Sequence, residues 1–140
     1  MKAKKVKPVK KPQMSLQEYL HKLFSIPVMG GRDFIPLREV THLDLNNKLL
    51  IINMCDLSTL PIDRTMISLN ELMPEPHFIM THAGYIVNLH YVRKHRPGKD
   101  GIGLKLSTGK IIPISDIHQQ AVKEALDDFS LHILPRPNKI

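Results

Sequence analysis

Residues 78–92 read FIMTHAGYIVNLHYV, and this stretch decides the fold of the chain. Its apolar residues could fill a core, but Ala83-Gly84 interrupts the run and Asn88 stands before Tyr91 and Val92. Glycine and asparagine are typical of turns between strands. We therefore predict two short strands kinked around Ala83-Gly84, with Asn88 at the turn that leads into Tyr91 and Val92.

Downstream of this stretch, the pattern predicts a hairpin and a closing helix. Residues 102–106 and 111–114 are apolar, and the turn sequence Ser-Thr-Gly-Lys separates them at 107–110, as in a hairpin. Ser115 is placed to cap a helix that follows. The apolar members of that helix would be Ile117, Ala121, Val122, Ala125 and Leu126.

Upstream, short apolar segments alternate with turn signals, of which Asn46-Asn47 is the strongest. Ser68 would cap a small helix that Pro74 and Pro76 end. The body of the chain, residues 33–130, is therefore predicted to be a mostly β domain of antiparallel strands with one or two short helices. The upstream strands would span 34–37, 40–45, 49–54 and 60–66, and the small helix would hold Leu69, Leu72 and Met73.

The two ends of the chain are expected to lie outside this domain. Residues 1–14 read as a disordered lysine-rich tail, and 131–140 as a loose C-terminus. Between the tail and the domain, the segment 15–32 is predicted to form a short amphipathic helix, capped by Ser15, and a linker. That helix could dock on the main domain or on a second copy of the chain. Its apolar face would consist of Leu16, Leu20, Leu23 and Phe24.

Composition restricts the class of protein. The 140 residues carry a net charge of +7, and 42% of them are hydrophobic, which suits one folded domain. There is no apolar run of transmembrane length and no apolar segment behind the first lysines, so a membrane span and a secretory signal are excluded. The single cysteine, Cys55, cannot form an internal disulfide. We expect a soluble cytoplasmic protein.

Most of the positive charge comes from the tail, because residues 1–12 contain six lysines and no acidic residue. Such a tail could bind polyanions without sequence preference, or could serve only as a solubilising terminus. In the body, Arg93, Lys94, Arg96 and Lys99 form a second basic cluster, which is either a phosphate-binding patch or a solvated loop.

Catalytic and metal chemistry find no support in the sequence. The eight histidines show no metal-ligand spacing, and Cys55 has no neighbouring ligand pattern. No glycine-rich phosphate loop opens a helix, and the acidic residues are scattered. We therefore expect neither an enzyme, nor a cofactor, nor a metal site.

The segment from about residue 34 to 125 resembles the LytTR family, the DNA-binding domain of many bacterial response regulators. Three motifs occur in the family's order: the Phe-x-x-x-His-x-x-Tyr-x-Val-Asn pattern at 78–88, the upstream Ser-Leu-x-x-Leu helix at 68–72, and the downstream Leu-x-x-Gly…Ile-Pro-Ile-Ser element at 106–115. The resemblance implies about ten short strands in three sheets. It also implies that loops between strands, rather than a recognition helix, enter the major groove of duplex DNA.

Carried over onto this sequence, the family's contact positions are only partly kept. Asn46, Asn47 and Lys48 can donate hydrogen bonds in the first loop. Ala83 and Gly84 follow His82 in the second loop and lack donors in their side chains, and the third loop has Asp116 where the family usually has arginine. The predicted DNA-binding residues are Asn46, Asn47, Lys48, Ser68, Asn70, His82, Ala83, Gly84, Arg93, Ser115, Asp116 and His118.

Two functions are expected from this resemblance. The first is a stand-alone LytTR-type transcriptional regulator that binds double-stranded promoter DNA, with paired repeats and a homodimer as further expectations by analogy. The alternative is a LytTR-like protein-interaction module that modulates another regulator and binds DNA weakly or non-specifically. The missing donors in the second and third loops favour the alternative, while the conserved order of the three framework motifs favours the first.

Overall fold

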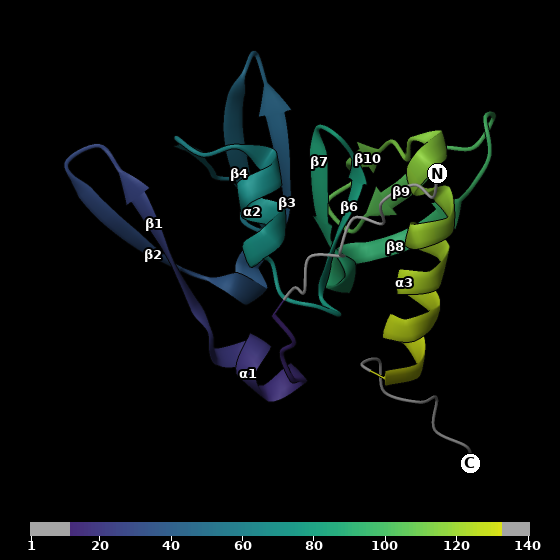
Figure 1. The fold of residues 1–140 in the computed structure, drawn as a ribbon, viewed down its shortest axis with the longest axis horizontal. Coiled ribbons are helices and arrows are strands. Elements are labelled where there is room, and N and C mark those ends of the chain that lie inside the picture. Colours follow the sequence, from purple (N-terminus) through teal and green to yellow (C-terminus); the bar gives the residue numbers. More distant parts are fainter. Residues whose placement is uncertain (1–11, 133–140) are drawn as a thin grey trace, which may run out of the picture.

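The computed structural model describes residues 12–132, and within them ten strands form three antiparallel sheets (Figure 1). This architecture confirms the mostly β fold expected from the sequence. Residues 1–11 and 133–140, which include most of the predicted tail and C-terminus, lie outside the described residues. Gln13 and Met14, which we expected in the loose tail, are instead hydrogen-bonded: both contact Glu75, through its side chain and its carbonyl oxygen.

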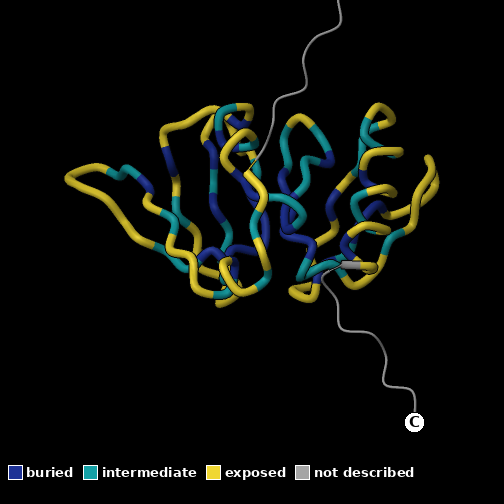
Figure 2. Tube along the Cα trace, turned by 60° about the horizontal axis from the view of Figure 1, so that its bottom comes forward, coloured by how far each residue is buried: buried dark blue, intermediate teal, exposed yellow. Residues whose placement is uncertain are grey.

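A five-stranded sheet in the order β5-β4-β3-β7-β6 forms the centre of the molecule. Apolar residues alternate along its strands, and Leu43, Leu50, Ile52 and Ile86 are fully buried in its core. The burial is visible as dark blue segments along the strands in Figure 2. The strands are β3 (Val40–Asn46), β4 (Leu49–Met54), β5 (Thr59–Ile62), β6 (Phe78–His82) and β7 (Tyr85–Asn88).

A three-stranded sheet and the C-terminal helix α3 (Gln119–His132) make a second, smaller core. The sheet contains β8 (Val92–Arg96), β9 (Gly103–Leu106) and β10 (Ile111–Ile112), so the predicted hairpin is correct. The helix face differs from the prediction: Ile117 and Ala121 are exposed, whereas Val122 and the unpredicted Phe129 are buried.

The segment 15–36 corrects the predicted helix and linker. Helix α1 (Leu16–His21) begins at Ser15 with a capping box, as the sequence suggested, but it ends before Leu23. Leu23 and Phe24 belong to β1 (Leu23–Val28), which pairs with β2 (Gly31–Pro36) in a two-stranded sheet that projects from the body (Figure 1). Gly30 has a φ of 86° in the connecting turn, so the Gly30-Gly31 pair makes a hairpin turn and not a linker.

Helix α2 (Met66–Leu72) begins one turn earlier than predicted. Its N-cap is Thr65, whose Oγ1 accepts a hydrogen bond from the Ser68 backbone N–H at 3.1 Å. Ser68 therefore lies inside the first turn, and its hydroxyl donates to the Thr65 carbonyl at 2.9 Å. The strand expected at 60–66 is shortened accordingly to β5.

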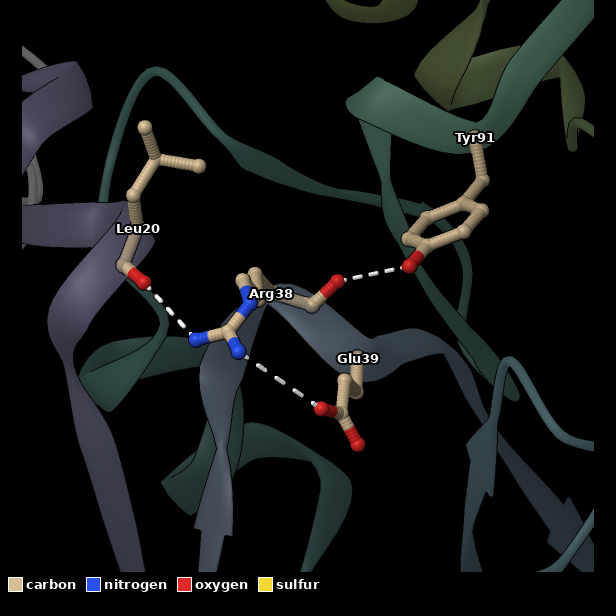
Figure 3. Close-up of polar contacts among 4 residues, drawn as sticks. All are labelled: Leu20, Arg38, Glu39 and Tyr91. Carbon is tan, nitrogen blue, oxygen red and sulfur yellow. Dashed lines mark hydrogen bonds and ion pairs between the residues drawn. The ribbon is translucent and has the colours of Figure 1, made fainter.

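Polar contacts fasten α1 to the body through the single turn η1 (Leu37–Glu39). Arg38 donates from Nη1 to the Leu20 carbonyl at 2.9 Å and lies 3.8 Å from the Glu39 carboxylate, while Tyr91 donates to the Arg38 carbonyl at 2.6 Å (Figure 3). Tyr19 of α1 is buried in the central core. The helix thus docks on the main domain, which decides between the two positions left open by the sequence.

Candidate nucleic-acid interface

Three connections meet along one edge of the molecule, at the top of Figure 1. We call them the loop row: residues 46–48, from the last residue of β3 to the start of β4; residues 82–84, from the last residue of β6 to the start of β7; and residues 115–118, before α3. The first two adjoin because β3 and β7 are antiparallel neighbours, and the Leu45 N–H donates to the Gly84 carbonyl at 3.1 Å. The third adjoins the second because the Ser115 N–H donates to the Thr81 carbonyl at 3.0 Å.

The first loop is a two-residue hairpin turn. Asn47 and Lys48 have φ angles of 51° and 68°, the left-handed pair that matches the twist of the flanking strands, and asparagine tolerates this region well. Asn46, Asn47 and Lys48 are all exposed. The turn therefore presents two amides and one ammonium group to the solvent at the tip of a stiff two-stranded ribbon.

The second loop is fixed by His82. The Gly84 N–H donates to His82 Nδ1 at 3.1 Å, so in the neutral ring Nε2 carries the proton and remains a donor for a ligand. The ring packs edge-on against Tyr85, with centroids 5.8 Å apart. Ala83 is exposed at the tip. A Cβ atom on Gly84 would lie 3.7 Å from His82 Nδ1, an ordinary contact, so a serine would fit at this position.

The third loop is the single turn η3 (Asp116–His118). Ser115 makes no side-chain cap to the backbone, contrary to the prediction; its Oγ lies 2.5 Å from His118 Nδ1. Desolvation, with a smaller contribution from the charge of His82, lowers the pKa of His118 and so favours its neutral ring. Asp116 is exposed and Ile117 is 87% exposed.

The remaining predicted site residues lie on regular elements and not in the loop row. Ser68 and Asn70 are on α2, which covers one face of the central sheet (Figure 1). Arg93 is at the start of β8, where its Nη1 donates to the His90 and Val92 carbonyls at 2.9 and 3.1 Å. The structure therefore brings together nine of the predicted residues and separates Ser68, Asn70 and Arg93 from them.

Two exposed apolar residues that the sequence did not nominate lie in the loop row or directly beside it. Leu45, at the base of the first loop, is 47% exposed, and Ile117 projects from the third. Ile117 had been assigned to the helix core from its spacing. An apolar side chain next to a turn gives no sequence signal that distinguishes a core position from an exposed loop position.

A group of cations lies on the three-stranded sheet beside the loop row. Within residues 12–132 the ion pairs found are Arg38–Glu39 and Lys123–Asp127, so the cations of β8 and β9 have no acidic partner there. Lys94 stands directly opposite Lys105 across the β8–β9 pair. These positive charges, of which Lys94 is exposed and Lys105 is half-buried, can attract phosphates that flank a ligand in the loop row.

Two clefts of about 370 Å³ each lie outside the loop row. One runs between β8 and α3, past Arg93 and Phe129. The other lies between the central sheet and the β9–β10 turn, where burial lowers the pKa of His42 to about 4. Across residues 12–132 no cluster of metal-ligating side chains occurs, and no helix there is long and apolar enough to cross a membrane.

The fold and the loop row together define a class of small β domains that present inter-strand loops along one edge. The family model of the LytTr DNA-binding domain matches residues 32–127, and the chain belongs to this family. Its structure is similar to the LytTr DNA-binding domain of a protein described as a methyl-accepting/DNA response regulator from Bacillus cereus: the TM-score is 0.65 at 20% identity, over 75% of this chain and 96% of that chain. Comparison with curated proteins gave no match.

Proposed function

We propose that this protein is a sequence-specific, DNA-binding transcriptional regulator that inserts the loop row into the major groove of duplex DNA. Membership of a family of DNA-binding domains supports the DNA-binding role. The observation that carries the finer proposal is the gathering of three loops from distant parts of the sequence along one edge. Their exposed amides and ammonium group, together with the half-buried imidazole of His82, are group types that can read base edges.

The shape of the loop row suits this role. The major groove is about 12 Å wide and admits a two-stranded ribbon, and the β3–β4 hairpin ends in a tight two-residue turn with exposed side chains. Positive charges on β8 and β9 would hold phosphates and set the orientation of the protein on the duplex. Base contacts would then come from Asn46, Asn47, Lys48 and His82.

The proposal is tested by selection from a library of random duplexes. The full chain is compared with a variant in which the six lysines of residues 1–12 are replaced by glutamine. Enrichment of one motif by both proteins supports base reading by the folded domain, with the lysines adding only affinity. Binding without a motif, lost in the glutamine variant, would contradict it. Sedimentation of the saturated complex would show whether two copies occupy paired repeats.

A second candidate function is that of a protein-interaction module on the same fold. It is favoured by the acidic residue in the third loop and by the lack of a side-chain donor at the tip of the second loop. Asp116 is exposed beside the expected phosphates and would be repelled by them, and Ala83 offers no hydrogen bond. In this case Asp116→Asn would leave DNA binding unchanged and weaken capture of a regulator from cell extract. If the first proposal holds, Asp116→Asn changes DNA affinity.

A further inference from the structure

We propose that the loop row recognises A·T-rich duplex DNA by contacting thymine 5-methyl groups through Ala83 and Ile117. The inference rests on the proposed function, because it assigns a base preference to the same loops. The second and third loops lack hydrogen-bond donors at these positions, and in this proposal they read bases through apolar contacts instead. In the major groove, thymine differs from the other bases by its methyl group, which small apolar side chains contact.

Ile117 is the first observation. It is 87% exposed, although an isoleucine gains free energy from burial. Its position is not that of a loose loop: Ser115 Oγ contacts His118 Nδ1 at 2.5 Å across the turn, and the Ser115 N–H is bonded to the Thr81 carbonyl at 3.0 Å. These contacts hold the turn in place, and the large apolar side chain of Ile117 stands in solvent at the edge proposed to meet DNA.

Ala83 is the second observation. Its methyl group stands exposed at the tip of the turn that His82 and Gly84 close by their hydrogen bond. The turn adjoins the third loop through the Thr81–Ser115 hydrogen bond, so the two apolar groups belong to neighbouring loops. Leu45, 47% exposed, adjoins the second loop on its other side through Gly84. The second and third loops thus each offer an exposed apolar group, and a further one lies on β3 just before the first loop.

The polar residues of the loop row agree with this preference. Asparagine pairs with adenine N6 and N7, and arginine is the commonest reader of guanine. The row carries the amides of Asn46 and Asn47, contains no arginine, and has Lys48 as its one long cation. Amides for adenine and methyl contacts for thymine together read the two edges of an A·T pair.

The experiment removes only the methyl groups. In the duplex enriched from the random library, thymines are replaced one at a time by deoxyuridine, which keeps the base pairing and the hydrogen-bonding edge. We expect affinity to fall about fourfold for each contacted methyl group, from the free energy of burying one such carbon. Thymines elsewhere in the duplex should show no change.

Protein variants assign the contact. Ile117→Ala should weaken binding to the thymine duplex and abolish the thymine–uracil difference at the positions that Ile117 contacts. Ile67→Ala is the matched control, because Ile67 is 72% exposed but lies on α2; it should keep the full difference. Circular dichroism melting would show that both variants fold.

The outcomes separate the two proposals. If one duplex is bound specifically, and with equal affinity for thymine and uracil at every position, the thymine inference is wrong while the proposed function stands. If no duplex is preferred at all, the proposed function fails and the inference fails with it. A thymine–uracil difference that survives in both Ile117→Ala and Ala83→Gly would also overturn the assignment to these residues.

Discussion

At the scale of single residues, the amide of Asn88 joins three parts of the molecule. It is fully buried, and its Nδ2 donates to Tyr19 Oη at 2.7 Å and to the Val40 carbonyl at 2.8 Å, while Oδ1 accepts from the His90 N–H at 3.0 Å. All three of these hydrogen bonds connect Asn88 to other parts of the fold, so its side chain has a structural role. The sequence reading of Asn88 as a turn former is therefore correct, and DNA contact by this residue is excluded by its burial.

Replacing Asn88 with alanine should destabilise the fold by about 3 kcal/mol, because buried donors and acceptors lose their partners at about 1–3 kcal/mol each. Urea unfolding followed by circular dichroism measures the change. Asn46→Ala is the matched control, since Asn46 is exposed and should change the unfolding free energy by less than about 0.5 kcal/mol. Equal effects of the two variants would contradict the framework role of Asn88.

Ala83→Arg should change the base preference of the protein. A guanidinium at the tip of the second loop can donate to guanine O6 and N7, a contact that discriminates by about 1–3 kcal/mol. We expect the motif from duplex selection to gain a guanine at one position and affinity for that duplex to rise about tenfold. Ser130→Arg, an equal gain of charge on the exposed side of α3, should raise affinity without changing the motif.

At the scale of secondary-structure elements, the pairing of β8 with β9 places two like charges face to face. Lys94 and Lys105 face each other directly in the antiparallel register, which destabilises a sheet. Lys94→Gln should therefore stabilise the protein by about 0.5 kcal/mol. The same change should lower the slope of log affinity against log salt by about 1 if Lys94 contacts a phosphate.

Lys99→Gln provides the control for this prediction. Lys99 lies in the β8–β9 loop and has no partner across a strand pair. Lys99→Gln therefore removes one positive charge, as Lys94→Gln does, but leaves the repulsion between Lys94 and Lys105 unchanged. Its unfolding free energy should stay within about 0.3 kcal/mol of that of the parent protein. Thermal melting at low salt is the measurement. A loss of stability in Lys94→Gln would contradict the argument.

The strands around the quoted stretch 78–92 could be predicted, because turn residues and apolar runs mark them locally. The β1–β2 hairpin could not. Leu16, Leu20, Leu23 and Phe24 fit the spacing of one helix face, and Pro27 is uncommon inside a strand. In the structure Pro27 lies on the two-stranded sheet, where a missing N–H costs little at an open edge, and Phe34 is left 63% exposed. Helical spacing in a short segment did not exclude a strand.

The individual loops of the candidate site could be predicted from the sequence, but their position next to one another could not. The turn chemistry of Asn46-Asn47 and of Ala83-Gly84 is local, so both turns could be read from the sequence. Their meeting depends on β3 pairing with β7 across some forty residues of chain, and nothing in the local pattern encodes that pairing. The same holds for the buried face of α3, where Phe129 and not Ile117 faces the core.

At the scale of the whole molecule, stability should depend on pH chiefly through His42 and His90, the histidines whose pKa values fall furthest. Burial lowers the pKa of His42 and of His90 to about 4, from an ordinary value of 6.5. The nearby charges are Asp44 and Lys110 for His42, and His77 for His90. Between pH 6.5 and pH 4 the unfolded chain binds more protons than the folded one, so stability falls as the pH falls through this window.

We expect the free energy of unfolding to drop by roughly 2 kcal/mol between pH 7 and pH 5, after allowance for solvent screening. Urea titrations at the two pH values, without DNA, measure it. His42→Gln should reduce the difference, because it removes one of the two groups. A protein that is equally stable at both values would contradict neutral burial of the histidines.

The contacts of α1 have a further consequence for the order of folding. The Tyr19–Asn88 hydrogen bond joins residues 69 apart, and the Gln13–Glu75 bond joins residues 62 apart. Contacts so distant in sequence form late, because closing a long stretch of chain costs entropy before any contact compensates it. A six-residue helix is also too short to persist alone. During synthesis, α1 must therefore wait unfolded until the chain has grown past Asn88.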